Sequence, residues 1–197
     1  MLDIAYPLKE THVIDDVEYD VDFSYDNILR IIDLMNDNTL DDESQVEIAL
    51  YMLLGFRLEC DIYKKETILN EILEDILKDE AESSPTVDLD GNPMPVVEEK
   101  SDSNYDLKQD APYIFASFMS DYGIDLFEQQ GMLHWEKFKA LLSGLTDDSK
   151  FMRVIDIRNM EIPSGKGTAK QAATIKKMKK QYALKGDDTN EFEDNQM

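Results

Sequence analysis

The stretch from Asp110 to Arg158 carries the densest helical patterning of the chain, and it constrains the fold more than any other segment. It contains the only Trp and one of the two His residues. Large apolar residues recur in it at spacings of three and four, which places them on one face of each successive helix. Packed helices of this kind bury a core together, so the pattern predicts a mainly α fold. The residues of these stripes are Ile114, Phe115, Phe118, Met119, Tyr122, Leu133, Trp135, Phe138, Leu141, Leu142 and Leu145.

Capping residues predict where the helices of this stretch begin and end. Asp110 is expected to cap the first helix, because its carboxylate can accept a backbone N–H of the first turn. Gly123 and Gly131 are expected to end helices in the left-handed conformation. The run that follows Gly144 fits a helix, although its apolar residues also fit a strand. The predicted helices cover residues 110–122, 124–130, 133–144 and, beginning within 146–148, a run to about 157.

The first 80 residues predict a β-hairpin followed by an acidic helical lobe. Residues 11–21 alternate apolar and polar side chains around Asp15 and Asp16, which predicts a small hairpin even though its turn lacks a Gly. Ser24 is expected to cap the first helix of the lobe. The other two helices are predicted from Asp41 or Asp42 to Gly55, and from about residue 62 to 78.

Two segments differ in composition from the rest. Residues 81–106 mix Pro, Gly and Ser with acidic residues and show little apolar periodicity, which predicts a flexible acidic linker. Residues 185–197 predict a disordered acidic tail. The predicted organisation is therefore an N-terminal hairpin and helical lobe, the linker, a helical core with a basic final helix, and the tail, covering residues 1–80, 81–106, 107–184 and 185–197.

The net charge of −23 is distributed unevenly along the chain. Residues 1–106 contain 7 Lys and Arg against 29 Asp and Glu, whereas residues 107–184 contain 12 against 9. Clustered negative charge repels polyanions, so direct binding of nucleic acid by the first half is disfavoured. A solvated face is the simplest interpretation of the lysines in the final helix, and docking to an acidic protein surface, such as this chain's first half, is the next. These lysines are Lys170, Lys176, Lys177, Lys179 and Lys180.

Other features of the composition favour a soluble protein of a reducing cytoplasm. Cys60 is the only cysteine, so an internal disulfide is excluded. No apolar run approaches the roughly 20 residues that a membrane span requires. The first ten residues, MLDIAYPLKE, lack the basic and apolar regions of a signal peptide. No membrane association is expected.

Two short motifs resemble ligand sites and fail on mechanism. Asp88, Asp90, Asn92 and Glu99 have the spacing of a calcium loop, but Pro93 stands where the sharp bend needs Gly. The run 164–168, SGKGT, lacks the upstream Gly and buried strand of a phosphate-binding loop. We therefore expect an acidic turn at the first and a flexible helix connection at the second.

Catalytic and metal-binding residues are not evident either. His12, His134 and Cys60 are too few for a zinc cluster, which usually takes four ligands, and His134 is expected at a helix start beside the core. Carboxylate pairs such as Asp147 and Asp148 arise readily in a chain with 43 acidic residues. No Ser/His/Asp or Cys/His arrangement can be singled out. We expect neither an enzyme nor a cofactor.

One part of the sequence resembles a known family. The run YGIDLFEQQGMLHWEKFKALLSGL, the run DDSKFMRVIDIRNMEIP and the basic helix after them resemble small proteins encoded in the tail gene cluster of long-tailed phages and prophages of Gram-positive bacteria. Members of that family look like tail assembly chaperones. The resemblance covers about residues 105–184 and rests on ordered aromatic and Gly positions rather than on a catalytic motif.

The resemblance implies a function, partners and candidate contact residues. It implies a chaperone that binds the tape-measure protein in the host cytoplasm and is absent from the mature virion. The tail-tube protein and further copies of the chain are additional candidate partners. Two alternatives stay open: a structural tail component retained in the virion, and an acidic DNA-mimic inhibitor. The positions carried over as partner-binding candidates, each more often core than interface, are Tyr122, Ile124, Leu126, Trp135, Phe138 and Leu142.

Overall fold

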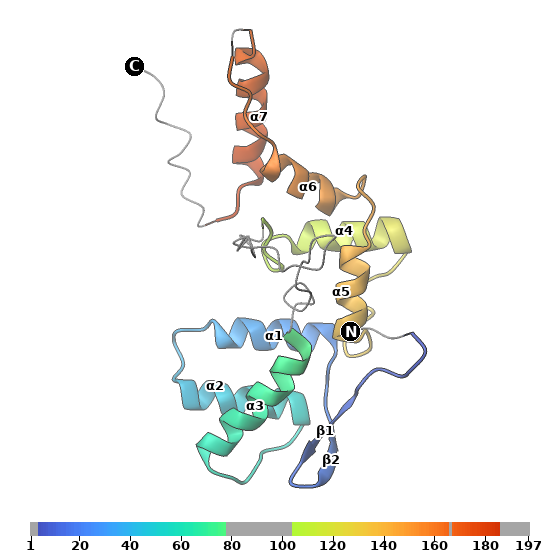
Figure 1. Ribbon diagram of the computed structural model, residues 1–197, viewed down its shortest axis with the longest axis vertical. Helices are drawn as coiled ribbons and strands as arrows, with labels where there is room; N and C mark the ends of the chain where they lie inside the picture. The colour runs from blue at the N-terminus through green and yellow to red at the C-terminus, as the bar shows by residue number, and fades with distance from the viewer. Residues whose placement is uncertain (1–3, 78–103, 166, 186–197) are drawn as a thin grey trace, which may run out of the picture. The chain divides into compact units, whose positions relative to one another are not determined.

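The computed structural model describes residues 4–77, 104–165 and 167–185 (Figure 1). Within these ranges the chain forms seven helices and one two-stranded sheet, which confirms the predicted mainly α fold with a small N-terminal hairpin. Almost all of the predicted linker and tail lies outside the described residues. The elements are β1 (Thr11–Ile14), β2 (Val17–Asp20), α1 (Tyr25–Met35), α2 (Asp42–Leu54), α3 (Ile62–Leu77), α4 (Ala111–Tyr122), α5 (Trp135–Ser143), α6 (Lys150–Asn159) and α7 (Ala169–Tyr182).

The chain divides into two compact units. Among the described residues, unit 1 comprises 4–77 and 127–140, and unit 2 comprises 104–126 and 141–185 without 166. The sequence pattern assigns residues 127–140 to the C-terminal core, whereas in the structure this segment packs with the N-terminal half. The division therefore follows long-range contacts rather than order along the chain.

The predicted hairpin of unit 1 is confirmed. β1 pairs antiparallel with β2 in a register that runs from Thr11 opposite Asp20 to Ile14 opposite Val17. Asp15 and Asp16 have φ values of 50° and 63°, so both occupy the left-handed region that a two-residue hairpin turn requires. Aspartate tolerates this region because its short side chain can bond locally, and the turn forms without Gly.

Three helices complete the N-terminal half of unit 1. α1 and α2 run in opposite directions and α3 packs on α2 (Figure 1). Asp41 caps α2 as expected, since its carboxylate accepts the backbone N–H of Ser44 at 2.9 Å, and Gly55 ends the helix with a φ of 76°. Ser24 stands at the N-cap position of α1, but its side chain makes no cap hydrogen bond. The buried apolar residues between these helices include Ile28, Ile31, Ala49, Leu50, Leu53, Leu69 and Ile72.

A backbone exchange joins residues 127–140 to α1. The Tyr25 N–H donates to the Leu133 carbonyl at 2.9 Å, and the Trp135 N–H donates to the Phe23 carbonyl at 2.8 Å. The Phe138 ring stacks against the Tyr25 ring with a centroid distance of 5.0 Å. The Trp135 ring stacks against the same Phe138 ring with a centroid distance of 5.5 Å. The only Trp of the chain therefore belongs to the core of unit 1.

The helix predicted over residues 124–130 is wrong. No helix forms there: residues 126–132 form consecutive turns, and the Gln129 carbonyl accepts the N–H groups of Met132 and Leu133 at 3.1 and 3.0 Å. Gly131 does adopt the left-handed conformation, with a φ of 69°, but it closes a turn. The helix predicted from Leu133 begins only at Trp135, since the two residues before it take part in the exchange with α1.

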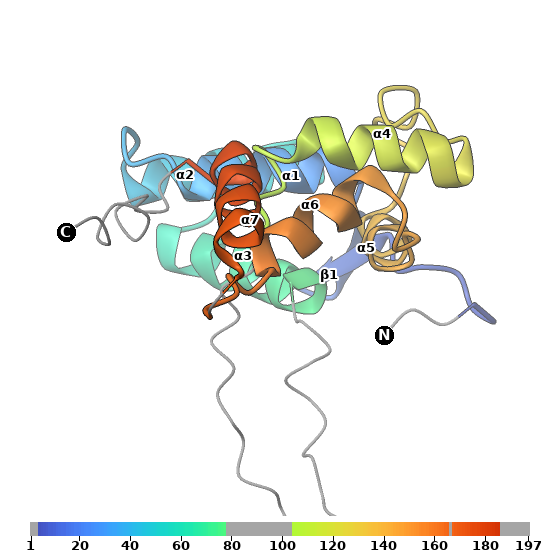
Figure 2. The same ribbon diagram turned by 90° about the horizontal axis from the view of Figure 1, so that it is seen from above.

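Unit 2 is built from three packed helices. α4 lies alongside α6, and α7 crosses near the end of α6 (Figures 1 and 2). α6 begins at Lys150, where Ser149 accepts the Met152 N–H at 3.3 Å, slightly later than predicted. The run after Gly144, which fitted either a helix or a strand, therefore forms a helix. Buried Ser117 joins α4 to α6, because its hydroxyl accepts the Phe151 N–H at 2.9 Å.

Asp110 has a different role from the predicted one. Its side chain makes no cap hydrogen bond to α4. Instead its two carboxylate oxygens accept hydrogen bonds from the two terminal nitrogens of Arg158, each at 2.6 Å. The exposed fraction of the side chain is 1% for Asp110 and 9% for Arg158. Arg158 also donates to the carbonyls of Tyr182 at 2.6 Å and Asn104 at 2.9 Å. The Arg158 guanidinium on α6 thus binds Asp110 at the start of α4, Asn104 before it, and Tyr182 at the end of α7.

We expect Arg158→Ala to lower the free energy of unfolding by about 3–5 kcal/mol, because it leaves the Asp110 carboxylate buried without its partner. Urea denaturation followed by far-ultraviolet circular dichroism measures the loss. Arg153→Ala is the matched control: Arg153 meets Asp148 at 4.0 Å on the surface, and its removal should change stability by less than about 0.5 kcal/mol. Equal effects of the two substitutions would contradict the assignment of Arg158.

A substitution in the hairpin turn is expected to stabilise the protein. Asp16→Gly should raise the free energy of unfolding by roughly 1 kcal/mol, because Gly takes the left-handed conformation without the steric cost of a Cβ. Asp15 is left unchanged, since it forms an ion pair with Lys64. Asp16→Val should lower stability, as a β-branched residue fits this region poorly. Melting temperatures of the two variants and the parent protein check the order.

Candidate functional site

The six predicted partner-binding residues are divided between the two units. Leu126, Trp135 and Phe138 are buried, with exposed fractions of 8%, 5% and 2%, and the last two form the aromatic stack of unit 1. The other three, Tyr122, Ile124 and Leu142, are half-buried in unit 2. Their role in partner binding stays a prediction, while the stack shows that Trp135 and Phe138 hold the core.

Tyr122 joins the end of α4 to the last part of α5. Its hydroxyl donates to the Leu141 carbonyl at 2.9 Å and its ring meets the edge of Phe118 at 5.8 Å. Burial raises the pKa of Tyr122, and the negative charge of Asp121 raises it further. Asp121 in turn accepts the Thr146 backbone N–H at 3.0 Å. The pair therefore connects the end of α4 to residues 141–146.

Two large apolar side chains on one turn of unit 1 are exposed together. Phe127 and Met132 are 71% and 67% exposed. Both lie on the turn of residues 127–132, which we call the apolar turn. The Gly131 N–H donates to the Asp26 carboxylate at 2.8 Å, and the hydrogen bonds to the Gln129 carbonyl close the turn on itself. The two side chains are thus presented to solvent by an ordered backbone.

A hollow of about 260 Å³ adjoins the apolar turn. It is smaller than the roughly 300–1,000 Å³ of typical small-molecule sites, so it suits a side chain of a partner protein better than a free ligand. Apolar and acidic groups share its walls. The lining residues are Glu10, Asp20, Val21, Asp22, Phe23, Ser24, Gly131, Met132 and His134.

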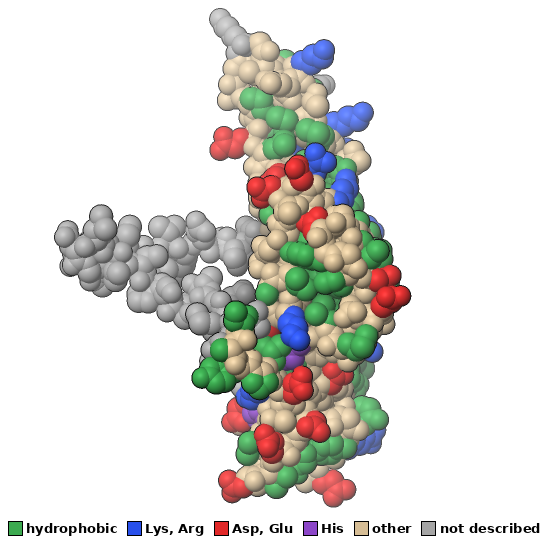
Figure 3. All heavy atoms as spheres, turned by 90° about the vertical axis from the view of Figure 1, so that its right-hand side faces the viewer, with side chains coloured by type: hydrophobic (Ala, Val, Ile, Leu, Met, Phe, Trp, Pro, Cys, Tyr) green, Lys and Arg blue, Asp and Glu red, His purple; other side chains and the backbone are tan. Residues whose placement is uncertain are grey.

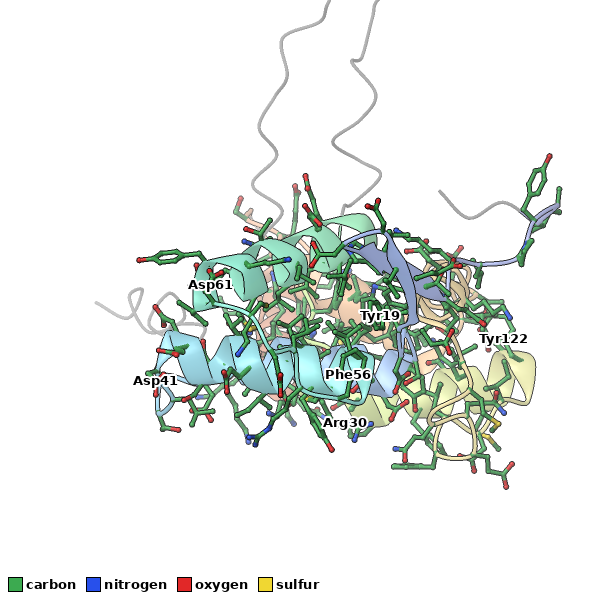
Figure 4. All side chains as sticks on the ribbon, turned by 90° about the horizontal axis from the view of Figure 1, so that it is seen from below. Tyr19, Arg30, Asp41, Phe56, Asp61 and Tyr122 are labelled. Carbon is green, nitrogen blue, oxygen red and sulfur yellow. The ribbon has the colours of Figure 1, made fainter. Side chains whose placement is uncertain are left out.

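A second hollow, of about 300 Å³, lies between the hairpin and the end of α2. The rings of Tyr19 and Phe56 point toward one another there, with centroids 5.3 Å apart (Figure 4). Val13 and Val17 on the hairpin are 59% and 49% exposed. These two hollows therefore combine aromatic walls with exposed apolar side chains, as protein-interaction surfaces do.

Sequence reasoning missed Phe127 and Met132. The helix predicted over 124–130 treats this stretch as part of the packed core, and neither residue falls on any of the predicted apolar stripes. That mismatch was the available signal. Large apolar residues beside Gly131 and outside the periodic pattern indicate a surface turn rather than a buried face.

The described ranges contain neither a candidate metal-binding cluster nor a candidate membrane-spanning helix. There, no group of three or more His, Cys, Asp and Glu residues is placed to hold a metal ion. No described helix is both long and apolar enough to cross a bilayer. His134 lies at the start of α5, where its Nδ1 accepts the Glu136 N–H at 3.1 Å. The calcium-like spacing of Asp88 to Glu99 and the side chain of Lys166 lie outside the described residues.

The described residues define a mainly helical protein that exposes large apolar side chains on an ordered turn. The chain belongs to the Bacteriophage Gp15 protein family, whose model matches residues 7–184. The predicted phage relationship is confirmed at this level, and it extends over both units rather than over residues 105–184 alone. Searches of curated proteins and of solved structures gave no match.

The contact between Asp121 and Thr146 predicts a pH dependence of stability. The Thr146 backbone N–H, followed by the Ser120 hydroxyl, lowers the pKa of Asp121 from its ordinary value. A carboxylate with a lowered folded-state pKa stabilises the protein above its unfolded-state pKa of about 3.9 and loses this effect as the pH falls through the lower value. Asp121→Ala should therefore reduce the melting temperature at neutral pH, and its difference from the parent protein should shrink below about pH 3.9. A difference that is constant down to about pH 2 would contradict this account.

Proposed function

We propose that this protein is a tail assembly chaperone, which binds the phage tape-measure protein and keeps it soluble in the host cytoplasm until tail-tube subunits polymerise around it. Two findings support the proposal. The chain belongs to a bacteriophage protein family over residues 7–184. The apolar turn lies inside the run whose resemblance to tail assembly chaperones was noted from the sequence.

The observation that carries the proposal is the exposure of Phe127 and Met132. Large apolar side chains that stay 71% and 67% exposed on an ordered turn favour aggregation unless a partner covers them. A tape-measure protein, taken as a long helical chain with apolar stripes, offers such a cover. The flexible Met side chain can adapt to many positions along a repetitive partner.

The charge around the apolar turn suits the same partner. Glu10, Asp20 and Asp22 line the adjoining hollow and can face the basic residues that flank an apolar stripe on a helix. The remaining acidic surface keeps a protein-coated chain dispersed through mutual repulsion. Binding by a small apolar surface with a charged rim is also reversible, which a chaperone requires.

A structural tail component is the second candidate, because family membership supports either role. The two are separated by the composition of purified particles. A chaperone is expected to be absent from mature virions, whereas a structural subunit is expected in stoichiometric amount. Quantitative mass spectrometry of gradient-purified particles makes the comparison, and a stoichiometric amount of this protein would replace the chaperone proposal.

Co-expression with the tape-measure protein tests the proposed contact. The parent protein should increase the soluble fraction of the tape-measure protein and co-purify with it. The double variant Phe127→Ser, Met132→Ser should bind at least about tenfold more weakly, since each buried apolar side chain contributes roughly 1.5–3 kcal/mol and about 1.4 kcal/mol corresponds to tenfold.

The matched control is the double variant Met119→Ser, Met160→Ser. Its side chains are 42% and 38% exposed in unit 2, and it should co-purify like the parent protein. Circular dichroism confirms that both variants fold. If the parent protein neither solubilises nor binds the tape-measure protein, the proposed function is wrong. If the parent binds and the apolar-turn variant binds equally well, the function stands and the contact surface is wrong.

A further inference from the structure

The outward side of α7 concentrates positive charge on an otherwise acidic protein. The helix carries five Lys and no acidic residue. Lys170, Lys177 and Lys180 are exposed, and a repeat of about 3.6 residues per turn places them on one side of the helix. Basic side chains, drawn in blue for Lys and Arg alike, project from the upper part of Figure 3, which contains α7. We call these three residues the lysine face.

Contacts within unit 2 hold the lysine face outward. The Lys179 ammonium donates to the Met160 carbonyl at 2.8 Å, and the Tyr182 carbonyl accepts Arg158. Lys150 lies 4.9 Å from the centre of the Tyr182 ring and donates to its hydroxyl at 3.1 Å. These contacts use the inner side of α7 and its C-terminal end, so the lysine face stays available for a partner.

Unit 1 has the opposite charge. Its described residues include 7 Lys and Arg against 21 Asp and Glu. No basic residue occurs between Arg30 and Arg57, and the exposed Met35 and Leu40 lie within this stretch. We call residues 33–43 the acidic corner, where α1 ends and α2 begins. Its acidic residues are Asp33, Asp37, Asp41, Asp42 and Glu43.

Hydrogen bonds keep part of the acidic corner ionised. The side chain and backbone of Thr39 lower the pKa of Asp37, and the backbone and side chain of Ser44 lower the pKa of Asp41. Both carboxylates therefore stay negative throughout the physiological range. The corner combines fixed negative charge with the apolar surface of Met35 and Leu40, which are 40% and 36% exposed. A basic helix with alanine between its lysines, such as Ala173 in α7, is a complementary partner.

We propose that the lysine face of one copy docks on the acidic corner of a second copy, so that copies associate head to tail. Charge complementarity supports a protein partner over nucleic acid, because a chain of net charge −23 repels a polyanion and α7 contains no Arg for base contacts. The two surfaces differ, so the interface is heterologous and adds copies in an open row or a ring. This association does not depend on the proposed chaperone function.

The strength of the contact follows from the kind of interaction. Exposed ion pairs contribute roughly 0.2–1 kcal/mol each and are screened by salt, with a Debye length of about 10 Å at about 0.1 M. Three lysines and a small apolar contact therefore give a weak, reversible association. It should be visible at low ionic strength and high protein concentration, and lost at high ionic strength.

Sedimentation velocity of the full-length chain tests the proposal. The sedimentation coefficient of the parent protein should rise with concentration from about 10 to 500 µM in about 50 mM salt, and should be constant in about 500 mM salt. The triple variant Lys170→Glu, Lys177→Glu, Lys180→Glu should stay monomeric under both conditions. The charge-matched control Lys108→Glu, Lys137→Glu, Arg153→Glu, which spares α7, should associate like the parent protein.

A charge swap identifies the second surface. Asp42→Lys with Glu43→Lys should also be monomeric alone, and mixing it with the triple α7 variant should restore a concentration-dependent species. Circular dichroism confirms that all variants fold. The proposal is overturned if the parent protein stays monomeric, if the α7 variant still associates, if the control variant is equally defective, or if the mixture stays monomeric. A salt-dependent change that does not vary with concentration would indicate a contact within one chain and would also overturn it.

Discussion

Unit 1 depends on the exchange of backbone hydrogen bonds between Phe23–Tyr25 and Leu133–Trp135. Gly131 and Asp26, beside this exchange, are 105 residues apart in the sequence, so closing the contact has a large entropic cost. The stack of Tyr25, Phe138 and Trp135 offsets that cost by burying three large aromatic rings. The same contact orders the apolar turn, because residues 127–132 immediately precede Leu133 and the Gly131 N–H donates to Asp26. Core packing and the presentation of Phe127 and Met132 thus share one origin.

Unit 2 is held by a different interaction. The Arg158 guanidinium satisfies the buried Asp110 carboxylate and two backbone carbonyls, so the desolvation cost of both charges is met by hydrogen bonds. A polar centre of this kind accepts one geometry only, whereas apolar side chains can repack. The orientation of α7 follows from it, since the Tyr182 carbonyl is one of the acceptors. The lysine face therefore points outward because of a contact on the opposite side of the helix.

Local signals in the sequence predicted most of the helices and strands correctly. They did not predict how these elements pack together. The Asp41 cap, the Gly55 and Gly123 ends and the alternation of the hairpin act over a few residues, and the structure has them as predicted. Asp110 satisfies the local rule for a cap but is claimed by Arg158, which is distant in the sequence. No local pattern encodes that choice. Burial has the same limit: Trp135 and Phe127 are both large aromatic residues of one motif, and only the long-range exchange with α1 separates core from surface.

The apolar turn and the lysine face respond to ionic strength in opposite ways. Burial of apolar surface is little affected by moderate salt and is strengthened by excluded salts such as sulfate, whereas contacts between lysines and carboxylates weaken as the Debye length falls. A chaperone that must coat a long partner and then leave it benefits from this division, because a weak contact between neighbouring copies adds avidity only while the partner holds them close. In the proposed function, tube subunits would displace the apolar contact, and the weak charge contact alone would not keep the copies together. Release would then require no covalent step or bound nucleotide, only competition for the apolar stripe.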